Sequence, residues 1–366
     1  MRLVSTTLTN ARADVIGKAL GAVAPHVDEC IVIDTGADEA TRINADVAVA
    51  TAGGRIHWVG WTWRNDFAAA RNFALTCAMG RGADWAIQAD TDEVYDFGDV
   101  APRDFLARAS EKGVDAVLVP HASRMFGQPR CLRIVPGKLP RWKMPVHEWL
   151  DGIQLGANAP DCWSWATQER PAEDLTAKYR HYARILERYI REHPKEPRGW
   201  FYLGDCYSIL ELSASALTAW DRRLKLAANP ATAGFYWEIG WTAWRAAVLR
   251  FQLGKLDEAD LTLQRGLERC PTMIELAWLR GYIAFRQGNF PQALYWANHA
   301  LAIPQENRHG GFAYPPAQLE YPLDLKMHCE RALGISSRAL TRPQPGQLAT
   351  HNGVPVSISA SGARLE

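Results

Sequence analysis

This 366-residue chain lacks the segments that mark membrane, secreted and zinc-binding proteins. No apolar stretch approaches the ~20 residues that a membrane-spanning helix needs. The first residues lack the longer apolar core of a signal peptide. The seven cysteines are scattered without a C-x-x-C pair, which is typical of neither a zinc site nor a disulfide framework. We therefore expect a soluble, cytoplasmic protein with reduced cysteines and no membrane span.

A surplus of charge is also missing. The 41 Lys and Arg residues balance 40 Asp and Glu residues, so the net charge of +1 gives no global attraction for nucleic acid. Neither a phosphate loop of the G-x-x-x-x-G-K-[ST] type nor a G-x-G-x-x-G motif occurs, which argues against nucleotide hydrolases and dinucleotide enzymes. A hydrophobic content of 48% indicates a globular protein, and the length favours two domains.

The first ~100 residues alternate short apolar runs with helical patterns. An order of strand and helix signals of this kind predicts a mostly parallel sheet covered by helices, because parallel strands need helical crossovers. The predicted strands span residues 3–8, 30–33, 55–59 and 85–89, and the clearest helices span 14–24 and 66–75. Downstream, we expect a strand at 116–119 and a hairpin that turns at Gly127-Gln128-Pro129.

Acidic residues follow two of these strands. Asp34 ends the second strand, and the stretch Asp90-Thr91-Asp92-Glu93 follows the fourth. Ligands of parallel sheets bind at the carboxyl ends of the strands, so we expect Asp34 and Asp90 to share one crevice. Two carboxylates one residue apart can hold a divalent cation against a diphosphate. The alternative is a solvated acidic turn.

From about residue 172 the pattern becomes helical and repetitive. Trp200, Leu203, Gly204 and Tyr207 match the opening of the tetratricopeptide repeat, and two later glycines lie 34 residues apart, which is the period of that repeat. We predict three repeats, with an insertion of about nine residues after the first, and a capping helix near 323–333. Small residues are expected where paired helices touch, namely at Ala216, Ala259 and Ala293.

Four sequence blocks, in this order, carry a resemblance to a known family: Ile33–Asp38, Trp63–Asn72, Ala89–Glu93 and Val146–Glu148. They resemble the glycosyltransferase family 2 enzymes of GT-A fold. The closest likeness is to the bacterial branch in which the transferase is followed by tetratricopeptide repeats. The resemblance implies a GT-A domain over 1–170 and a repeat domain over 171–340. The Pro-, Gly- and Ser-rich composition from Thr341 predicts a flexible tail over 341–366. The chain departs from the family after the first strand, where Thr9-Asn10-Ala11 lacks the usual acidic residue.

The resemblance also implies roles for individual residues. Asp92, with His147, is expected to bind Mn²⁺ or Mg²⁺, and Glu148 or Glu93 is expected to take the acceptor's proton. Simpler roles remain open, such as helix capping for Asp66, a turn for Asp34 and a surface position for His147. The residues expected to contact the nucleotide sugar are Thr7, Asp34, Asp66, Arg71 and Asp90.

The resulting prediction is a metal-dependent, inverting transferase that moves a sugar from a UDP-linked donor to a protein, glycan or lipid, with the repeats available to a protein partner. One alternative is an inactive, transferase-like scaffold that binds partners through its repeats. Another is a transferase acting on modified DNA bases. Phosphate contacts would then come from a basic run interleaved with Trp142, comprising Arg124, Arg130, Arg133, Lys138, Arg141 and Lys143.

Overall fold

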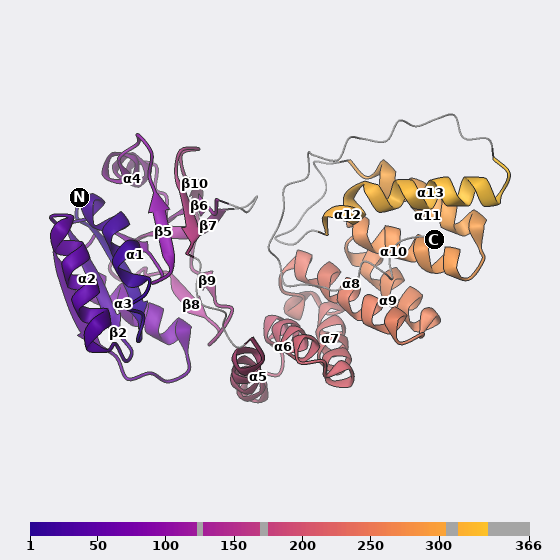
Figure 1. The fold of residues 1–366 in the computed structure, drawn as a ribbon, viewed down its shortest axis with the longest axis horizontal. Coiled ribbons are helices and arrows are strands. Elements are labelled where there is room, and N and C mark those ends of the chain that lie inside the picture. The colour runs from indigo at the N-terminus through magenta and orange to yellow at the C-terminus, as the bar shows by residue number, and fades with distance from the viewer. Residues whose placement is uncertain (123–126, 169–174, 305–313, 336–366) are drawn as a thin grey trace. The chain divides into compact units, whose positions relative to one another are not determined.

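The protein is described by a computed structural model that covers residues 1–122, 127–168, 175–304 and 314–335. The chain divides into two compact units, Met1–Asp174 and Leu175–Glu366 (Figure 1). The predicted domain boundary at 170, the predicted tail from 341 and Arg124 lie outside the described residues. Within the described ranges, no helix is long and apolar enough to cross a membrane.

The first unit is built on a seven-stranded sheet with the order β10-β6-β7-β4-β1-β2-β3. Strands β1 to β4 run parallel, while β7 runs antiparallel to both of its neighbours. The prediction of a mostly parallel sheet is therefore confirmed. The strands are β1 (Leu3–Thr9), β2 (Glu29–Asp34), β3 (Ile56–Gly60), β4 (Trp85–Gln88), β6 (Ala116–Pro120), β7 (Gly127–Arg133) and β10 (Gly156–Asn158).

Helices cover both faces of this sheet. Helices α1 (Ile16–Val23), α2 (Glu39–Thr51) and α4 (Pro102–Glu111) pack on one face, against side chains such as Cys30 and Val32. Helix α3 (Phe67–Gly80) packs on the other face, against Ile31 and Ile33. Successive residues of a strand point to opposite faces, so a strand buried on both sides must be apolar throughout. This explains the continuous apolar run in β2.

The predicted turn at Gly127-Gln128-Pro129 is wrong. These residues lie inside β7 and pair with Leu118–Pro120 of β6. The register of this pair shifts at Val117 and Leu118, and Pro129, which has no N–H to donate, pairs at that irregularity. A side chain at Gly127 would come within 3.1 Å of Leu118, so this glycine permits a close backbone approach.

Two small antiparallel sheets were not predicted. One joins β5 (Glu93–Asp96) to β11 (Ser164–Thr167), and the other joins β8 (Arg141–Lys143) to β9 (Trp149–Asp151). Each strand has only three or four residues, too few to show an alternating pattern. These sheets position two predicted site residues. Glu93 is the first residue of β5, and Glu148 lies between β8 and β9.

The second unit consists of helices that stack in sequence order (Figure 1). Helix α5 (Leu175–Glu192) precedes three antiparallel pairs, and α13 (Glu320–Ala332) packs on the last pair, after the short α12 (Pro315–Gln318). The three predicted repeats and the capping helix are confirmed. The pairs are α6 (Pro197–Ile209) with α7 (Ser213–Ala227), α8 (Tyr236–Gln252) with α9 (Leu256–Arg269), and α10 (Ile274–Arg286) with α11 (Phe290–Ala302).

The predicted insertion has a structural counterpart. The connection from α7 to α8 and helix α8 itself are each four residues longer than their equivalents in the next repeat, and α7 is one residue longer than α9. Small residues permit close helix contacts, as expected: Ala259 and Ala293 are fully buried. Gly204 is required in the same way, because a side chain there would come within 2.3 Å of the Trp220 ring.

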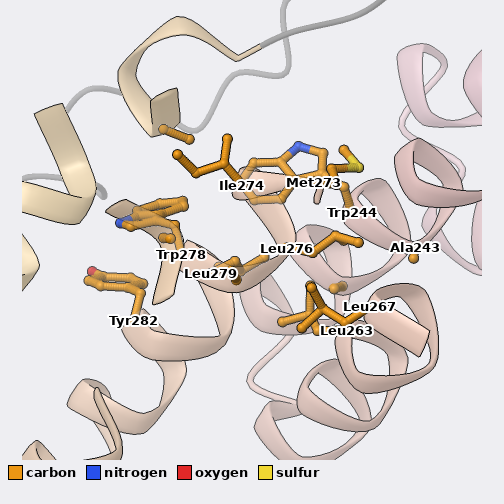
Figure 2. Packing of buried hydrophobic residues seen from close by; sticks show 14 of the residues in the cluster. Ala243, Trp244, Leu263, Leu267, Met273, Ile274, Leu276, Trp278, Leu279 and Tyr282 are labelled. Atoms are coloured by element: carbon orange, nitrogen blue, oxygen red, sulfur yellow. The ribbon is translucent and has the colours of Figure 1, made fainter. Parts of the chain in front are cut away.

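Aromatic side chains fill the core of this unit. Figure 2 shows Trp278 and Tyr282 on the same side of α10, where their rings stack at 5.7 Å. Trp244 of α8 lies 5.8 Å from Trp278, so the ring cluster joins successive repeats. These tryptophans are core residues, and their burial accounts for part of the unusual tryptophan content.

Candidate active site

The carboxyl ends of the parallel strands bring the predicted acidic residues to one edge of the sheet. Thr9 of β1 pairs with Asp34 of β2, which in turn pairs with Gly60 of β3. Strand β4 pairs with β1 and ends two residues before Asp90. Asp34 and Asp90 therefore lie at the same edge, as the strand order predicts.

Arg71, in the block Trp63–Asn72, forms hydrogen bonds with residues of two other sequence blocks. Its Nη1 and Nη2 donate to the two oxygens of Asp90 at 2.8 and 3.0 Å, and its Nε donates to Glu148 at 2.6 Å. The Arg71 side chain is only 10% exposed. Burial would lower its pKa, but the charges of Asp90 and Glu148 hold that pKa above its ordinary value. Arg71 is therefore a permanent cation between two carboxylates.

Helix α3 orients this arginine and the segment that carries Glu148. Asp66 caps the helix by accepting a hydrogen bond from the Ala69 N–H at 2.8 Å. The side chain of Asn72 donates to the Trp142 carbonyl at 2.9 Å and accepts from its N–H at 2.8 Å. The Phe67 N–H donates to the Pro145 carbonyl at 2.9 Å. The block Trp63–Asn72 thus fixes the β8–β9 segment beside the acidic cluster.

Arg130 was missed as a site residue, having been assigned only to the basic run. Its Nη2 donates to Glu93 at 2.6 Å, its Nη1 lies 3.9 Å from an Asp90 oxygen, and its guanidinium lies 4.1 Å from the Trp165 ring centre. The side chain is 7% exposed. Arg130 adjoins the apolar residues Cys131 and Leu132 in the sequence, and a charge next to buried apolar residues needs a partner, which was the available signal.

Glu93 lies behind Asp90. The pKa of Glu93 is raised to about 7, chiefly by burial and then by the Asp90 charge, although Arg130 opposes both. Its carboxylate accepts a hydrogen bond from the Asp90 N–H at 3.1 Å. With only 6% of its side chain exposed, Glu93 is placed to hold Asp90 and Arg130.

The predicted metal ligands are next to cluster residues in the sequence: Asp92 lies between Asp90 and Glu93, and His147 directly precedes Glu148. Asp92 is 8% exposed, and His147 adopts a left-handed backbone with φ of 55°. Among the described residues, no three or more His, Cys, Asp or Glu side chains are grouped to hold a metal ion. Hard cations such as Mg²⁺ are often held by one or two carboxylates plus substrate phosphates. Binding of Mn²⁺ or Mg²⁺ by Asp92 and His147 stays a prediction.

The two remaining predicted nucleotide contacts differ in environment. Asp34 accepts hydrogen bonds from Gly36 and Ala37 at 2.8 and 2.6 Å and also from Arg42. Burial would raise its pKa, but these donors together lower it, so Asp34 is ionised and shapes its own turn. Thr7 is 1% exposed, and its hydroxyl has no hydrogen-bond partner among the described residues.

The basic run is largely engaged within its own unit. Besides Arg130, Lys138 lies 3.4 Å from Asp115, and Lys143 lies 3.7 Å from Asp151. Trp142 is almost buried, with the Arg71 guanidinium 5.5 Å from its ring centre. A DNA site on this run stays a prediction. Since Arg130, Lys138 and Lys143 already contact carboxylates, fewer cations are available for phosphates than the sequence suggests.

Comparison with known proteins identifies the repeats. Residues 245–307 match the family model for the tetratricopeptide repeat. A TPR repeat-containing protein of Synechococcus elongatus is 39% identical over 83 residues, which is 22% of this chain and 18% of that protein. The chain thus matches less than a fifth of that relative's length.

Solved structures with a similar chain path have low sequence identity. MamA from Desulfovibrio magneticus is 14% identical, with 45% of this chain and 97% of MamA covered at a TM-score of 0.29. TarS of S. aureus is 12% identical, with 71% of this chain and 54% of TarS covered at a TM-score of 0.42. At these TM-scores neither likeness carries an argument about activity. The second unit contains tetratricopeptide repeats, and the first is an α/β unit with an acidic cluster at the edge of its sheet.

Proposed function

We propose that the first unit is a glycosyltransferase that moves a sugar from a UDP-linked donor to an acceptor, with Mn²⁺ or Mg²⁺ bound beside the donor diphosphate. The observation that carries the proposal is the set of contacts around Arg71. Three sequence blocks that resemble family 2 transferases meet there, although Arg71 and Glu148 are separated by 77 residues. They meet at the sheet edge where α/β proteins bind nucleotides.

A divalent cation would be held by Asp92 and by the diphosphate, with His147 and Asp90 nearby. Such an ion stabilises the negative charge of the departing diphosphate. Arg71 and Arg130 contribute fixed positive charge at the same edge, and charge that is already oriented costs no reorganisation during the reaction. The remaining donor contacts are proposed for Thr7, Asp34 and Asp66.

Glu148 is the better of the two candidate bases. Its side chain is 13% exposed, against 6% for Glu93, and it lies on the segment that α3 holds over the cluster. A base must come within hydrogen-bond reach of the acceptor hydroxyl. Glu148 is paired with Arg71, so we propose that acceptor binding opens this pair. Glu93 holds Asp90 and Arg130 in position.

The proposal is tested by donor hydrolysis with Mn²⁺, comparing UDP-glucose, UDP-N-acetylglucosamine, UDP-galactose and GDP-mannose. One UDP-sugar should be preferred, and Asp92→Ala should lower its turnover by about 100-fold or more, since a catalytic metal supplies several kcal/mol. Asp99→Ala, an exposed acidic residue, is the matched control. Hydrolysis that is equal for both variants and the parent chain would show that the mechanism is wrong.

A second candidate is a transferase-like scaffold without activity. It is favoured by the pairing of both Asp90 oxygens with Arg71 and by Asn10-Ala11, where the family has an acidic residue. Titration calorimetry with UDP and Mn²⁺ separates the two candidates. Binding of UDP that requires Mn²⁺ supports the transferase, and no heat at millimolar UDP supports the scaffold.

A further inference from the structure

A pocket of about 570 Å³ lies in the helical unit, away from the tryptophan-rich core. It is formed by α5, the end of α6 and the turn that leads into α7. Tyr207 donates a hydrogen bond to Glu187 at 2.7 Å, which ties α6 to α5 inside the pocket. All of its lining residues come from this unit.

One wall of the pocket continues into a row of arginines on α5. Arg180, Arg184, Arg188 and Arg191 are spaced by four, four and three residues, which places them on one helix face. All four are exposed. None forms an ion pair with any residue of the described ranges. A chain with a net charge of only +1 therefore concentrates unpaired positive charge on one helix.

The rest of the pocket lining is mixed, with polar side chains beside apolar ones. Ala183 of α5, Ile209 and Leu210 line it, and Leu212 at its rim is 49% exposed. Exposed leucine beside unpaired arginine is typical of interaction surfaces, where arginine is enriched and apolar side chains provide the buried area. The pocket thus combines apolar side chains with the cations Arg180 and Arg184 and the carboxylates Glu187 and Glu211.

The aromatic face of the later repeats is already covered by the chain itself. Tyr314 lies 5.9 Å from Trp244, Tyr321 lies 5.0 Å from Trp278, and the Tyr314 N–H donates to Glu275. Ala317 of α12 is fully buried in the same core cluster as Trp244 and Trp278. A partner that binds this unit finds the α5 pocket more accessible than this face.

We propose that the α5 pocket, together with the arginine row, docks an acidic segment of a protein partner. The segment would place an apolar side chain in the pocket and its carboxylates against Arg180 and Arg184. Nucleic acid fits less well, because Ile209, Leu210 and Leu212 offer apolar contacts that a phosphate backbone cannot use. The docking role holds whether or not the first unit transfers sugars.

The test uses the full chain and a fluorescein-labelled peptide of about twelve residues in which pairs of glutamates alternate with single leucines. We expect micromolar affinity that weakens with salt. The double variant Arg180→Glu with Arg184→Glu should bind at least about tenfold more weakly. The matched control, Arg265→Glu with Arg269→Glu on α9, makes the same charge change at exposed positions and should stay within about twofold of the parent chain.

Three further measurements decide the proposal. Replacing the leucines of the peptide by serines should weaken binding, since the apolar side chains of the pocket then have no partner. Asp92→Ala should bind the peptide as the parent chain does, which separates this proposal from the transferase. The proposal is overturned if the peptide does not bind, if both double variants lose affinity equally, or if a single-stranded oligonucleotide of equal charge binds more tightly.

Discussion

Each unit buries a cluster of arginines and carboxylates, and the two clusters differ in their access to solvent. In the first unit, Asp90 is 29% exposed although Arg71 and Arg130 contact it. In the second unit, Glu238 is completely buried, and Asp205 is 13% exposed. The second cluster, which joins α6, α7 and α8, consists of Arg198, Arg223, Arg245, Asp205 and Glu238.

The comparison teaches that buried charge alone does not mark a ligand site. Both clusters shift pKa values, and burial raises the pKa of Glu93 and of Glu238 to about 7. Only the first cluster stands at the carboxyl ends of parallel strands, and its Asp90, at 29% exposed, is more accessible to solvent than Asp205 or Glu238 of the second. This difference supports the proposal of a ligand at the first cluster and of a structural role for the second.

The largest effect is expected from Arg71→Met. Removing this cation leaves Asp90 and Glu148 without their main partner, and breaking a buried ion pair from one side costs about 3 kcal/mol or more. The free energy of unfolding, measured by urea denaturation, should fall by that amount. Arg108→Met, at an exposed position of α4, is the control and should change it by less than about 0.5 kcal/mol. Equal losses in the two variants would contradict the central role of Arg71.

The second cluster should make the helical unit sensitive to pH. Glu238 has a pKa of about 7 in the folded protein, chiefly because of burial, against an ordinary value of 4.5. Between these values the folded protein holds a proton that the unfolded chain has released, so stability falls as pH rises. We expect a loss on the order of 2 kcal/mol between pH 5 and pH 7.5.

Hydrogen–deuterium exchange, with peptides of each unit followed separately, measures this loss in the helical unit. Glu238→Gln carries no titrating group and should flatten the pH dependence. A dependence of the same size in this variant would show that another group causes it.

A smaller effect is expected from Arg223→Met. Arg223 is fully buried, its Nε and Nη1 have no hydrogen-bond partner, and burial lowers its pKa although Glu238 opposes this. Replacing a poorly satisfied buried charge by an apolar side chain of similar length is often neutral or stabilising. Urea denaturation should therefore give a change within about 1 kcal/mol. A loss as large as that of Arg71→Met would remove the contrast between the two clusters.

Much of this fold was predictable because its signals are local. The apolar run in β2 is visible within a few residues, and the 34-residue spacing of Gly254 and Gly288 is visible by comparing two neighbouring stretches of the chain. The four strands of the two small sheets were not predictable, since each has three or four residues and is stabilised by a partner distant in sequence. For β5 and β11, Tyr95 pairs with Trp165, 70 residues away.

The candidate site was predictable to the extent that its residues follow strands. Asp34 and Asp90 were placed at one edge because the carboxyl ends of parallel strands meet there. Arg130 was not, because its partner Glu93 lies 37 residues away and β7 was mistaken for a turn at its start. The side of the cluster on which Glu148 lies depends on the hydrogen bonds of Asn72, which no sequence pattern reveals.

The smallest effects compare one helix cap in each unit. Asp66 caps α3 through a 2.8 Å hydrogen bond from Ala69, and Asn289 caps α11 through a 3.3 Å bond from Gln292. Replacing a capping residue by alanine costs about 0.5–2 kcal/mol, and the shorter, charged bond belongs at the upper end of that range. Urea denaturation should therefore give about 1.5 kcal/mol for Asp66→Ala and about 0.5 kcal/mol for Asn289→Ala.

Donor hydrolysis should differ between the two cap variants more than their free energies of unfolding do. Asp66→Ala frees the first turn of α3, which positions Arg71 and Asn72, so donor hydrolysis should fall by more than the loss of folded protein explains. Asn289→Ala lies in the repeat unit and should leave turnover per folded molecule unchanged. Asp66→Asn keeps an oxygen that can accept the Ala69 bond, so it should restore the cap. If it restores stability without restoring turnover, the Asp66 carboxylate itself contacts the donor, and its role exceeds capping.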